Sequence, residues 1–529
     1  MTASSKSIKY VFTLTLLAAV PAFAQQPKLI IGIIVDGLKQ ETLDLLSPHF
    51  RPDGFNRFLK DGVVIENVDY GTNLDAAASV ALLLTGATPV VNGISSERIY
   101  EPEGRRTRSV FQDENALGNF TEETLSPQAL KLTTVSDEAR IAGAGVTYVY
   151  AIAPEASQAL LLGSHAGNSA VWFNDNTGNW ATSTFYKETP AAILNVNRTN
   201  SLKNRLDGMI WEPSPTTAKA AGLPDHLTRY PFKYSFPSKD SERYARFANS
   251  PLINDEITAL AQEYINGMQL GKHDGTDVLN LGFTLQPFEF SKTAENRYEL
   301  YDSYIKLDAS LAKLLNAAEN VAGKDNVVVY ISGTPSRGER RVDDEKWNIP
   351  GGDFSSRKAV SLLNLYLIAL HGNGEWVKSY HNNQFYLNSD LANSLDKDIT
   401  LLRRQAADFL VLMSGVGHAY TIEDIISANP VVPNALGKSR NTVIPQAGDV
   451  EIELIPGWRL IDDYNFIGQE SKTVKALTPT TAPFMIKAPQ LNSKRIDAPI
   501  DARSIAPAIA GLLHIRAPNG ANTPAVSFK

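Results

Sequence analysis

The chain has 529 residues, of which 43% are hydrophobic and 20% are charged, as in an ordinary globular protein with room for one or two large cores. Its formal net charge of -7 provides no basic surface, so nucleic acid is not an expected partner. The chain contains no cysteine, which excludes disulfide bonds and a lipid anchor on cysteine.

The first predicted element is an export signal at residues 1–24. A positively charged start precedes an apolar stretch at 10–20, too short to span a bilayer comfortably, and residues 22–24 read Ala-Phe-Ala. An uncleaved membrane anchor is the alternative interpretation. We expect cleavage between Ala24 and Gln25, and a mature protein in the periplasm or associated with the outer membrane. It would have no transmembrane segment and would not be a lipoprotein.

Apolar runs bounded by polar turns predict buried strands of a parallel sheet. These runs cover residues 28–35, 146–150, 278–283 and 326–331. Helical patterns lie at residues 76–85, 296–318 and 504–513. Strands that alternate with helices predict a doubly wound, mainly parallel α/β sheet with helices on both faces. In such a sheet the functional site lies beyond the carboxyl ends of the strands.

Two regions interrupt this alternation. Residues at about 190–250 are rich in Pro, Tyr, Arg and Ser, and a second irregular region spans about 340–470. We expect residues 25–529 to form one α/β domain in which these two insertions build a smaller cap over the sheet edge. Insertions vary more freely than a sheet, so the cap is the expected partner surface.

Several motifs together resemble one family. Residues 34–38 (Ile-Val-Asp-Gly-Leu) resemble a metal-ligand strand, residues 84–94 the segment that follows a nucleophile, and residues 163–183 and 501–521 two further blocks. The family is the alkaline phosphatase superfamily, in its branch of large periplasmic alkaline phosphatases and type I phosphodiesterase/nucleotide pyrophosphatase-like proteins. The resemblance covers about residues 28–525 and implies an alkaline phosphatase-like fold.

The resemblance also implies a reaction. Active members hold two zinc ions with Asp and His ligands and attack a phosphate ester with Thr or Ser. Two cations about 4 Å apart clamp the attacking and leaving oxygens, and imidazole and carboxylate groups suit zinc. The hydroxyl needs this activation, because a free Ser or Thr is a weak nucleophile at neutral pH.

Nearly every position that should carry this chemistry holds another residue. Asp36 is the one expected metal ligand that remains, as a relic, and Ala76 occupies the nucleophile position. The other, degenerate metal positions hold Pro287, Ser291, Thr334, Pro335 and Lys472. Residues 153–157 also lack the Lys and Arg that would bind a phosphoryl oxygen. Metal binding depends on the complete ligand set, so we expect no cofactor, or zinc if the site has been rebuilt.

Several residues near this site have two possible roles. Asp36 either caps the turn after its strand or still binds a group, and Asp75 is either the cap of the next helix or a substitute nucleophile. The positive charges of Arg337, Arg340 and Arg341 either bind an anion, since Arg recognises phosphate in bidentate fashion, or belong to a solvated loop.

The sequence therefore predicts an exported pseudophosphatase. It would keep the fold, lack the nucleophile and zinc ligands, and act as a binding or scaffold protein of the cell envelope with a protein partner. The alternative is a metal-dependent phosphate-ester hydrolase with an unorthodox site, rebuilt for example from His371, His381 and nearby acids. A third reading is an anion- or glycan-binding protein that reuses the cleft.

Overall fold

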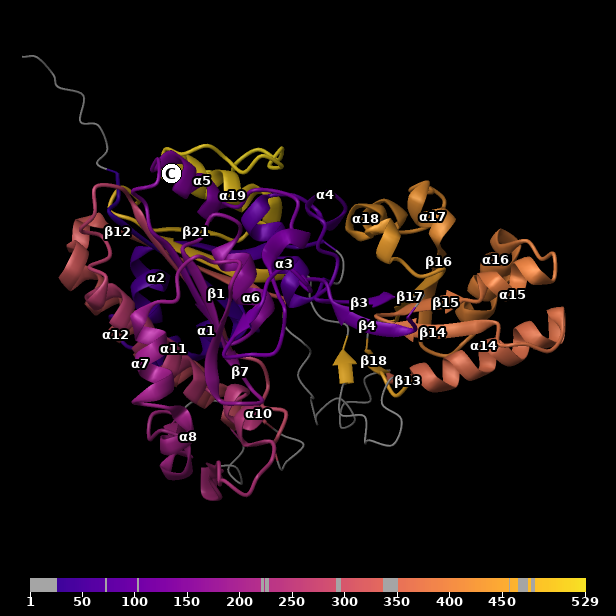
Figure 1. The fold of residues 1–529 in the computed structure, drawn as a ribbon, viewed down its shortest axis with the longest axis horizontal. Helices are drawn as coiled ribbons and strands as arrows, with labels where there is room; N and C mark the ends of the chain where they lie inside the picture. Colours follow the sequence, from indigo (N-terminus) through magenta and orange to yellow (C-terminus); the bar gives the residue numbers. More distant parts are fainter. Residues whose placement is uncertain are drawn as a thin grey trace, which may run out of the picture.

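The computed structural model shows a larger α/β body and a smaller body beside it (Figure 1). The described residues are 26–71, 74–101, 104–219, 223, 228–291, 296–335, 351–455, 457–464, 474–476 and 481–529. The predicted export signal at 1–24 lies outside them. Within the described part of the chain, no helix combines the length and the apolar character that crossing a membrane requires.

An eleven-stranded sheet forms the larger body, and its centre is parallel. The parallel strands are β12 (Val327–Thr334), β1 (Leu29–Asp36), β11 (Asp277–Thr284), β6 (Val149–Ala153) and β7 (Ser169–Asn174), in that spatial order. On the other side of β12 lies β20 (Thr481–Lys487), antiparallel to both β12 and β2 (Val63–Asp69). The predicted fold class, a mainly parallel α/β sheet, is confirmed.

The central strand β1 is buried on both faces, as its apolar run predicts. Its side chains alternate between two cores: Ile31 and Ile33 join one, and Ile30 and Ile34 join the other. Each core is covered by helices, so the sheet sits in the middle of three layers.

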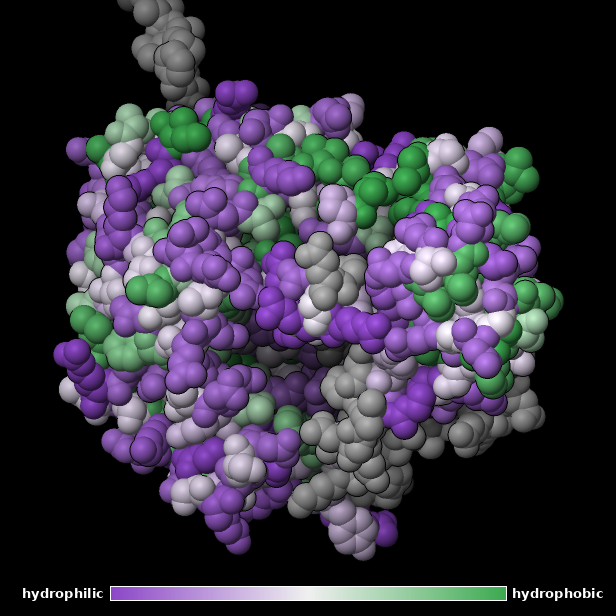
Figure 2. Space-filling model, turned by 45° about the vertical axis from the view of Figure 1, so that its right-hand side comes forward, coloured by the Kyte–Doolittle hydropathy of each residue, from purple (hydrophilic) through white to green (hydrophobic). Residues whose placement is uncertain are grey.

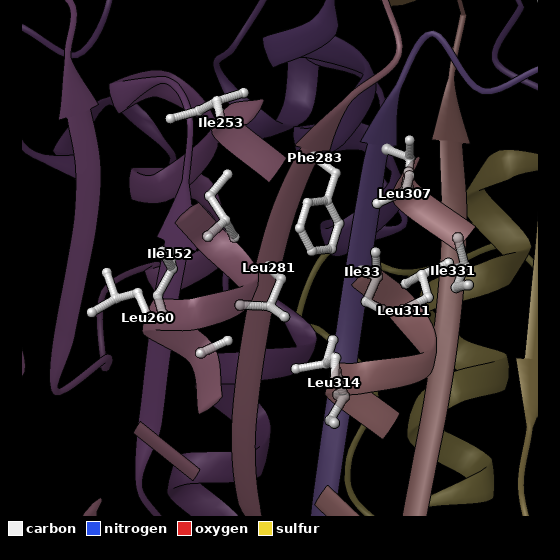
Figure 3. Close-up of a cluster of buried hydrophobic side chains, with 14 of the residues drawn as sticks. Ile33, Ile152, Ile253, Leu260, Leu281, Phe283, Leu307, Leu311, Leu314 and Ile331 are labelled. Carbon is white, nitrogen blue, oxygen red and sulfur yellow. The ribbon is translucent and has the colours of Figure 1, made fainter. Parts of the chain in front are cut away.

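Two long helices cover one face of the sheet, α11 (Leu252–Gly267) and α12 (Arg297–Ala322). Figure 3 shows side chains of α12, such as Leu311, lying over Ile33 and Ile331 of the strands. The other face carries the helices α3 (Ala76–Thr85), α5 (Val135–Ala142), α6 (Ala156–Gly163) and α19 (Ile505–Leu512).

The region at 190–250 packs on the larger body. It contains the helices α7 (Ala191–Arg198) and α10 (Arg243–Ala248). Its buried apolar residues, including Trp211, belong to the same core as α11 and α12. This region therefore shares the core of the sheet and has no separate core of its own among the described residues.

The smaller body has a core of its own. It combines the helices α14 (Ser356–His371) and α16 (Ile399–Val411) with a four-stranded sheet of β14 (Val377–His381), β15 (Gln384–Leu387), β17 (Val450–Leu454) and β16 (Val416–Thr421). The chain enters it after β12 and returns to the large sheet at β20. The hairpin of β3 (Arg98–Glu101) and β4 (Arg106–Ser109) extends from the larger body towards it (Figure 1).

Candidate functional site

Asp36 lies at the carboxyl-end edge of the sheet, where the strand register brings three chain segments together. Asp36 is level with Thr334 at the end of β12 and with Thr284 at the end of β11. The side chains of the residues that follow each strand therefore meet at one place, as the parallel architecture requires.

The carboxylate of Asp36 is held by neutral groups from both neighbours. Thr334 donates its hydroxyl to one oxygen, and Gln286 Nε2 donates to the other at 2.9 Å. A zinc ligand set would place imidazole and carboxylate groups here. A hydroxyl and an amide that donate to the carboxylate do not fit two zinc ions. Among the described residues, no group of three or more His, Asp or Glu side chains is arranged to hold a metal.

A second hydrogen-bond network lies beneath this pair. Tyr70 donates to the carbonyl oxygen of Gly333 at 2.7 Å, and its hydroxyl lies 3.3 Å from Ser332 Oγ. Burial raises the pKa of Tyr70, so the phenol stays neutral and can only act as a hydrogen-bonding group. The contacts of Tyr70 with Ser332 and Gly333 thus hold the end of β12, which carries Thr334, in place.

The remaining predicted positions provide no metal ligand among the described residues. Pro287 and Pro335 are half-buried and have no side-chain donor. Ser291 donates to Glu299 at 2.9 Å, an oxygen that also accepts a bond from Tyr234 at 2.7 Å. Four further residues of the predicted site, Lys472, Arg337, Arg340 and Arg341, lie outside the described residues.

The nucleophile position lies at the start of α3. Ala76 is the first residue of this helix, and Asp75 caps it by accepting a hydrogen bond from the Ala78 amide at 2.8 Å. The capping interpretation of Asp75 is confirmed. Ser79, one turn into the helix, is fully buried and exposes no hydroxyl that could replace the nucleophile.

The two histidines proposed for a rebuilt metal site lie in separate hydrogen bonds. His371 Nε2 is 2.7 Å from Gln405 Oε1, and His381 Nε2 is 2.9 Å from the carbonyl oxygen of Arg98. Each bond engages one ring nitrogen, and among the described residues neither histidine belongs to a group of His, Asp or Glu side chains that could hold a metal.

Sequence reasoning missed a Ser-His-Asp cluster in the larger body. Ser164 Oγ and His165 Nδ1 both bind Asp137 Oδ2, at 2.6 and 3.2 Å, and His165 Nε2 lies 2.9 Å from the carbonyl oxygen of Leu130. A catalytic triad needs the imidazole between Ser and Asp. Here Ser and His share one carboxylate oxygen and Ser164 is fully buried, so the cluster is a structural brace.

We expect His165 to titrate above pH 6.5, because its hydrogen bond to Asp137 raises the pKa of the imidazole above that ordinary value. The bond stabilises the folded chain most below pH 6.5, and this contribution is lost as pH rises through the raised pKa. NMR titration of the imidazole signals, assigned with His165→Gln, measures it. The pKa should fall in Asp137→Asn, where the carboxylate charge is gone. Titration at or below pH 6.5 in the parent chain would contradict the assignment.

Solved structures with this fold include alkaline phosphatases. The crystal structure of wild-type alkaline phosphatase PafA superposes with a TM-score of 0.81 at 22% identity, over 95% of this chain and 98% of that one. In sequence, the chain is 25% identical to alkaline phosphatase PhoV of Synechococcus elongatus, over 94% of this chain and 92% of PhoV. It is 24% identical to PafA of Elizabethkingia meningoseptica, over 94% of this chain and 93% of PafA.

These relatives correct the expectation that the chain takes no cofactor. Alkaline phosphatases that match almost end to end belong to the class in which zinc is the expected metal. The expectation was wrong because it treated missing ligands at counted positions as proof that no metal is used. The hydrogen bonds at Asp36 argue only against two zinc ions bound at that edge of the sheet.

The family model for type I phosphodiesterase/nucleotide pyrophosphatase matches residues 30–466. The match begins in β1, runs through the central strands and continues into the smaller body. The chain therefore belongs to the type I phosphodiesterase/nucleotide pyrophosphatase family of the alkaline phosphatase superfamily.

Proposed function

We propose that this family member is a pseudophosphatase, an exported protein of the cell envelope that binds or scaffolds a protein partner and does not turn over phosphate esters. Residues 1–24 would direct export, and the smaller body, within the insertion at about 340–470, would offer the partner surface. The bonding of Asp36 to Thr334 and Gln286 is the observation that carries the proposal. Asp36, the one retained metal-ligand residue, thus accepts hydrogen bonds from neutral donors of the chain itself.

The start of α3 supports the same proposal. A helix N-terminus attracts anions, and in this chain the carboxylate of Asp75 already lies there. Ala76 has no hydroxyl to attack an ester, and the segment 153–157 holds Glu155 and no Lys or Arg that would bind a phosphoryl oxygen. A phosphate ester would meet repulsion where an active enzyme provides attraction.

The surface at the boundary of the two bodies fits a polar partner. Figure 2 shows a hollow between them, with mainly hydrophilic described side chains around it. A partner that enters there would make hydrogen bonds and charge contacts with the rim. Apolar packing would play a smaller part.

A phosphatase assay tests the catalytic half of the proposal. The purified mature chain is mixed with p-nitrophenyl phosphate or bis-p-nitrophenyl phosphate, with and without added zinc, beside PafA as the positive control. We expect no turnover above the enzyme-free rate, and no change in Asp36→Ala. Zinc-dependent turnover that disappears in Asp36→Ala would show that the chain is a hydrolase.

A further inference from the structure

A tight hairpin of the smaller body reaches the larger one. Strands β14 and β15 are joined by Asn382 and Asn383, whose φ angles are +48° and +64°. Positive φ at both central residues is the requirement of the two-residue type I′ turn, and Asn tolerates it better than most residues. The turn therefore has a defined conformation, which fixes the position of the Asn382 side chain.

The hairpin tip is connected by hydrogen bonds to the start of α3. Asn382 Nδ2 donates to Ser96 Oγ at 2.8 Å, and Ser96 Oγ donates to Asp75 Oδ2 at 2.8 Å. The Glu97 amide donates to the same carboxylate oxygen at 2.6 Å. The other oxygen of Asp75 caps α3 through the Ala78 amide. The series runs from the smaller body to the helix that begins at the nucleophile position.

We propose that Asp75, Ser96 and Asn382 form a latch that holds the smaller body closed on the sheet edge. Every donor in the series points towards the Asp75 carboxylate. Hydrogen bonds to an ionised acceptor are roughly twice as strong as neutral ones, and bonds in series polarise one another. The residue beside the vestigial nucleophile position thus has a conformational role, independent of whether the chain binds a partner or hydrolyses an ester.

Other contacts across the boundary have different roles. Arg105 and Glu375 form an ion pair at 3.1 Å, but their side chains are 53% and 55% exposed, and such pairs contribute little. Tyr100 and Tyr386 pack with ring centroids 4.4 Å apart and are buried. The tyrosine pair supplies apolar burial, which is weakly directional. The latch supplies directional contacts that fix the angle between the two bodies, together with the hydrogen bonds of His381 Nε2 with the Arg98 carbonyl oxygen at 2.9 Å and of Ser95 Oγ to Gln446 Oε1 at 2.6 Å.

The absence of cysteine allows a direct measurement of that angle. Spin labels on Leu117→Cys in the larger body and Leu412→Cys in the smaller one occupy sites that are 63% and 83% exposed. Double electron–electron resonance should give one narrow distance distribution in the otherwise unchanged chain. In Ser96→Ala, and in Asn382→Gly, the distribution should broaden or shift. Glycine keeps the positive-φ turn and removes the side-chain amide that donates to Ser96.

Three further variants make the test specific. Asp75→Ser keeps a helix-capping oxygen but is too short to maintain both the cap and the contact with Ser96, so it should behave like Ser96→Ala. Asn383→Gly changes the same turn, yet the Asn383 side chain accepts a hydrogen bond from the Tyr380 hydroxyl within the smaller body, at 3.2 Å. Asn383→Gly and Glu375→Ala should leave the distribution unchanged.

Thermal unfolding of each variant confirms that it is folded before its distances are compared. Unchanged distributions in Ser96→Ala, Asn382→Gly and Asp75→Ser would overturn the latch. Equal broadening in Asn383→Gly would also overturn it, because the effect would then belong to the hairpin in general. Neither outcome depends on the phosphatase assay.

Discussion

Replacing Trp211 by Ala should lower the free energy of unfolding by about 3–5 kcal/mol, the range found for large aromatic side chains truncated in a core. Trp211 is almost fully buried and packs against Phe232 and Phe288, with ring centroids 4.9 Å away in each case. Its indole nitrogen donates to Asp302 at 2.8 Å. The truncation would therefore remove packing, open a cavity and leave a buried carboxylate with one donor fewer.

Trp211→Phe separates these contributions. Phenylalanine keeps most of the aromatic packing but cannot donate to Asp302, which retains bonds from the Ser214 amide and the Thr217 hydroxyl, each at 2.7 Å. We expect a loss of about 1–3 kcal/mol, as for an unsatisfied buried polar group. Urea unfolding followed by far-ultraviolet circular dichroism measures both variants. A loss below about 1 kcal/mol for Trp211→Ala would show that this region contributes little to the larger body.

Gly32→Ala should cost about 2–3 kcal/mol, at the upper end of the usual range for an overpacked core. Gly32 lies in the middle of β1, and an added Cβ would stand 2.3 Å from the Tyr330 hydroxyl oxygen and 2.4 Å from Asn280 Oδ1. Both neighbours belong to adjacent strands, β12 and β11. Both side chains are buried, and Asn280 Nδ2 is held by hydrogen bonds to Ser136 Oγ and the Leu162 carbonyl oxygen, so they have little room to turn away.

A double-mutant cycle identifies the clash. Tyr330→Phe removes the nearest atom, so Gly32→Ala should cost less in that background, and the difference is the coupling between the two positions. Gly511→Ala is the matched control. It lies in α19 with nothing within 4 Å of the added Cβ, and should be neutral or stabilise the chain by up to about 1 kcal/mol. Equal costs for Gly32→Ala in both backgrounds would assign the strain to Asn280 or to the ring carbon Cζ of residue 330, which an added Cβ would meet at 2.6 Å.

The central strands could be predicted because strands buried on both faces appear in the sequence as continuous apolar runs. The run at 28–35 predicted β1, and the runs at 278–283 and 326–331 predicted its two neighbours. The antiparallel β20 and β2 were not predicted. Their pairing depends on a chain that leaves the sheet after β12 and returns much later, which no local pattern encodes.

The contacts that define the candidate site were harder to predict. Thr334 and Asp36 are separated by 298 residues, and Ser96 and Asn382 by 286. Neither pair has a sequence signal beyond the identity of its residues. The helix cap at Asp75 was predictable, because a capping interaction spans only three residues. Its continuation into the smaller body depends on tertiary structure.

The ends of the smaller body lie side by side. Gly351, at its entry, approaches the backbone of Gly457 so closely that a Cβ on Gly351 would stand 2.4 Å from the Gly457 carbonyl oxygen. The strands that follow, β13 (Gly352–Ser355) and β18 (Trp458–Ile461), pair in parallel. In the large sheet, β12 and β20 are also direct neighbours. The chain therefore enters and leaves the smaller body at neighbouring positions. A lineage could gain, exchange or delete this body without changing the strand order of the large sheet.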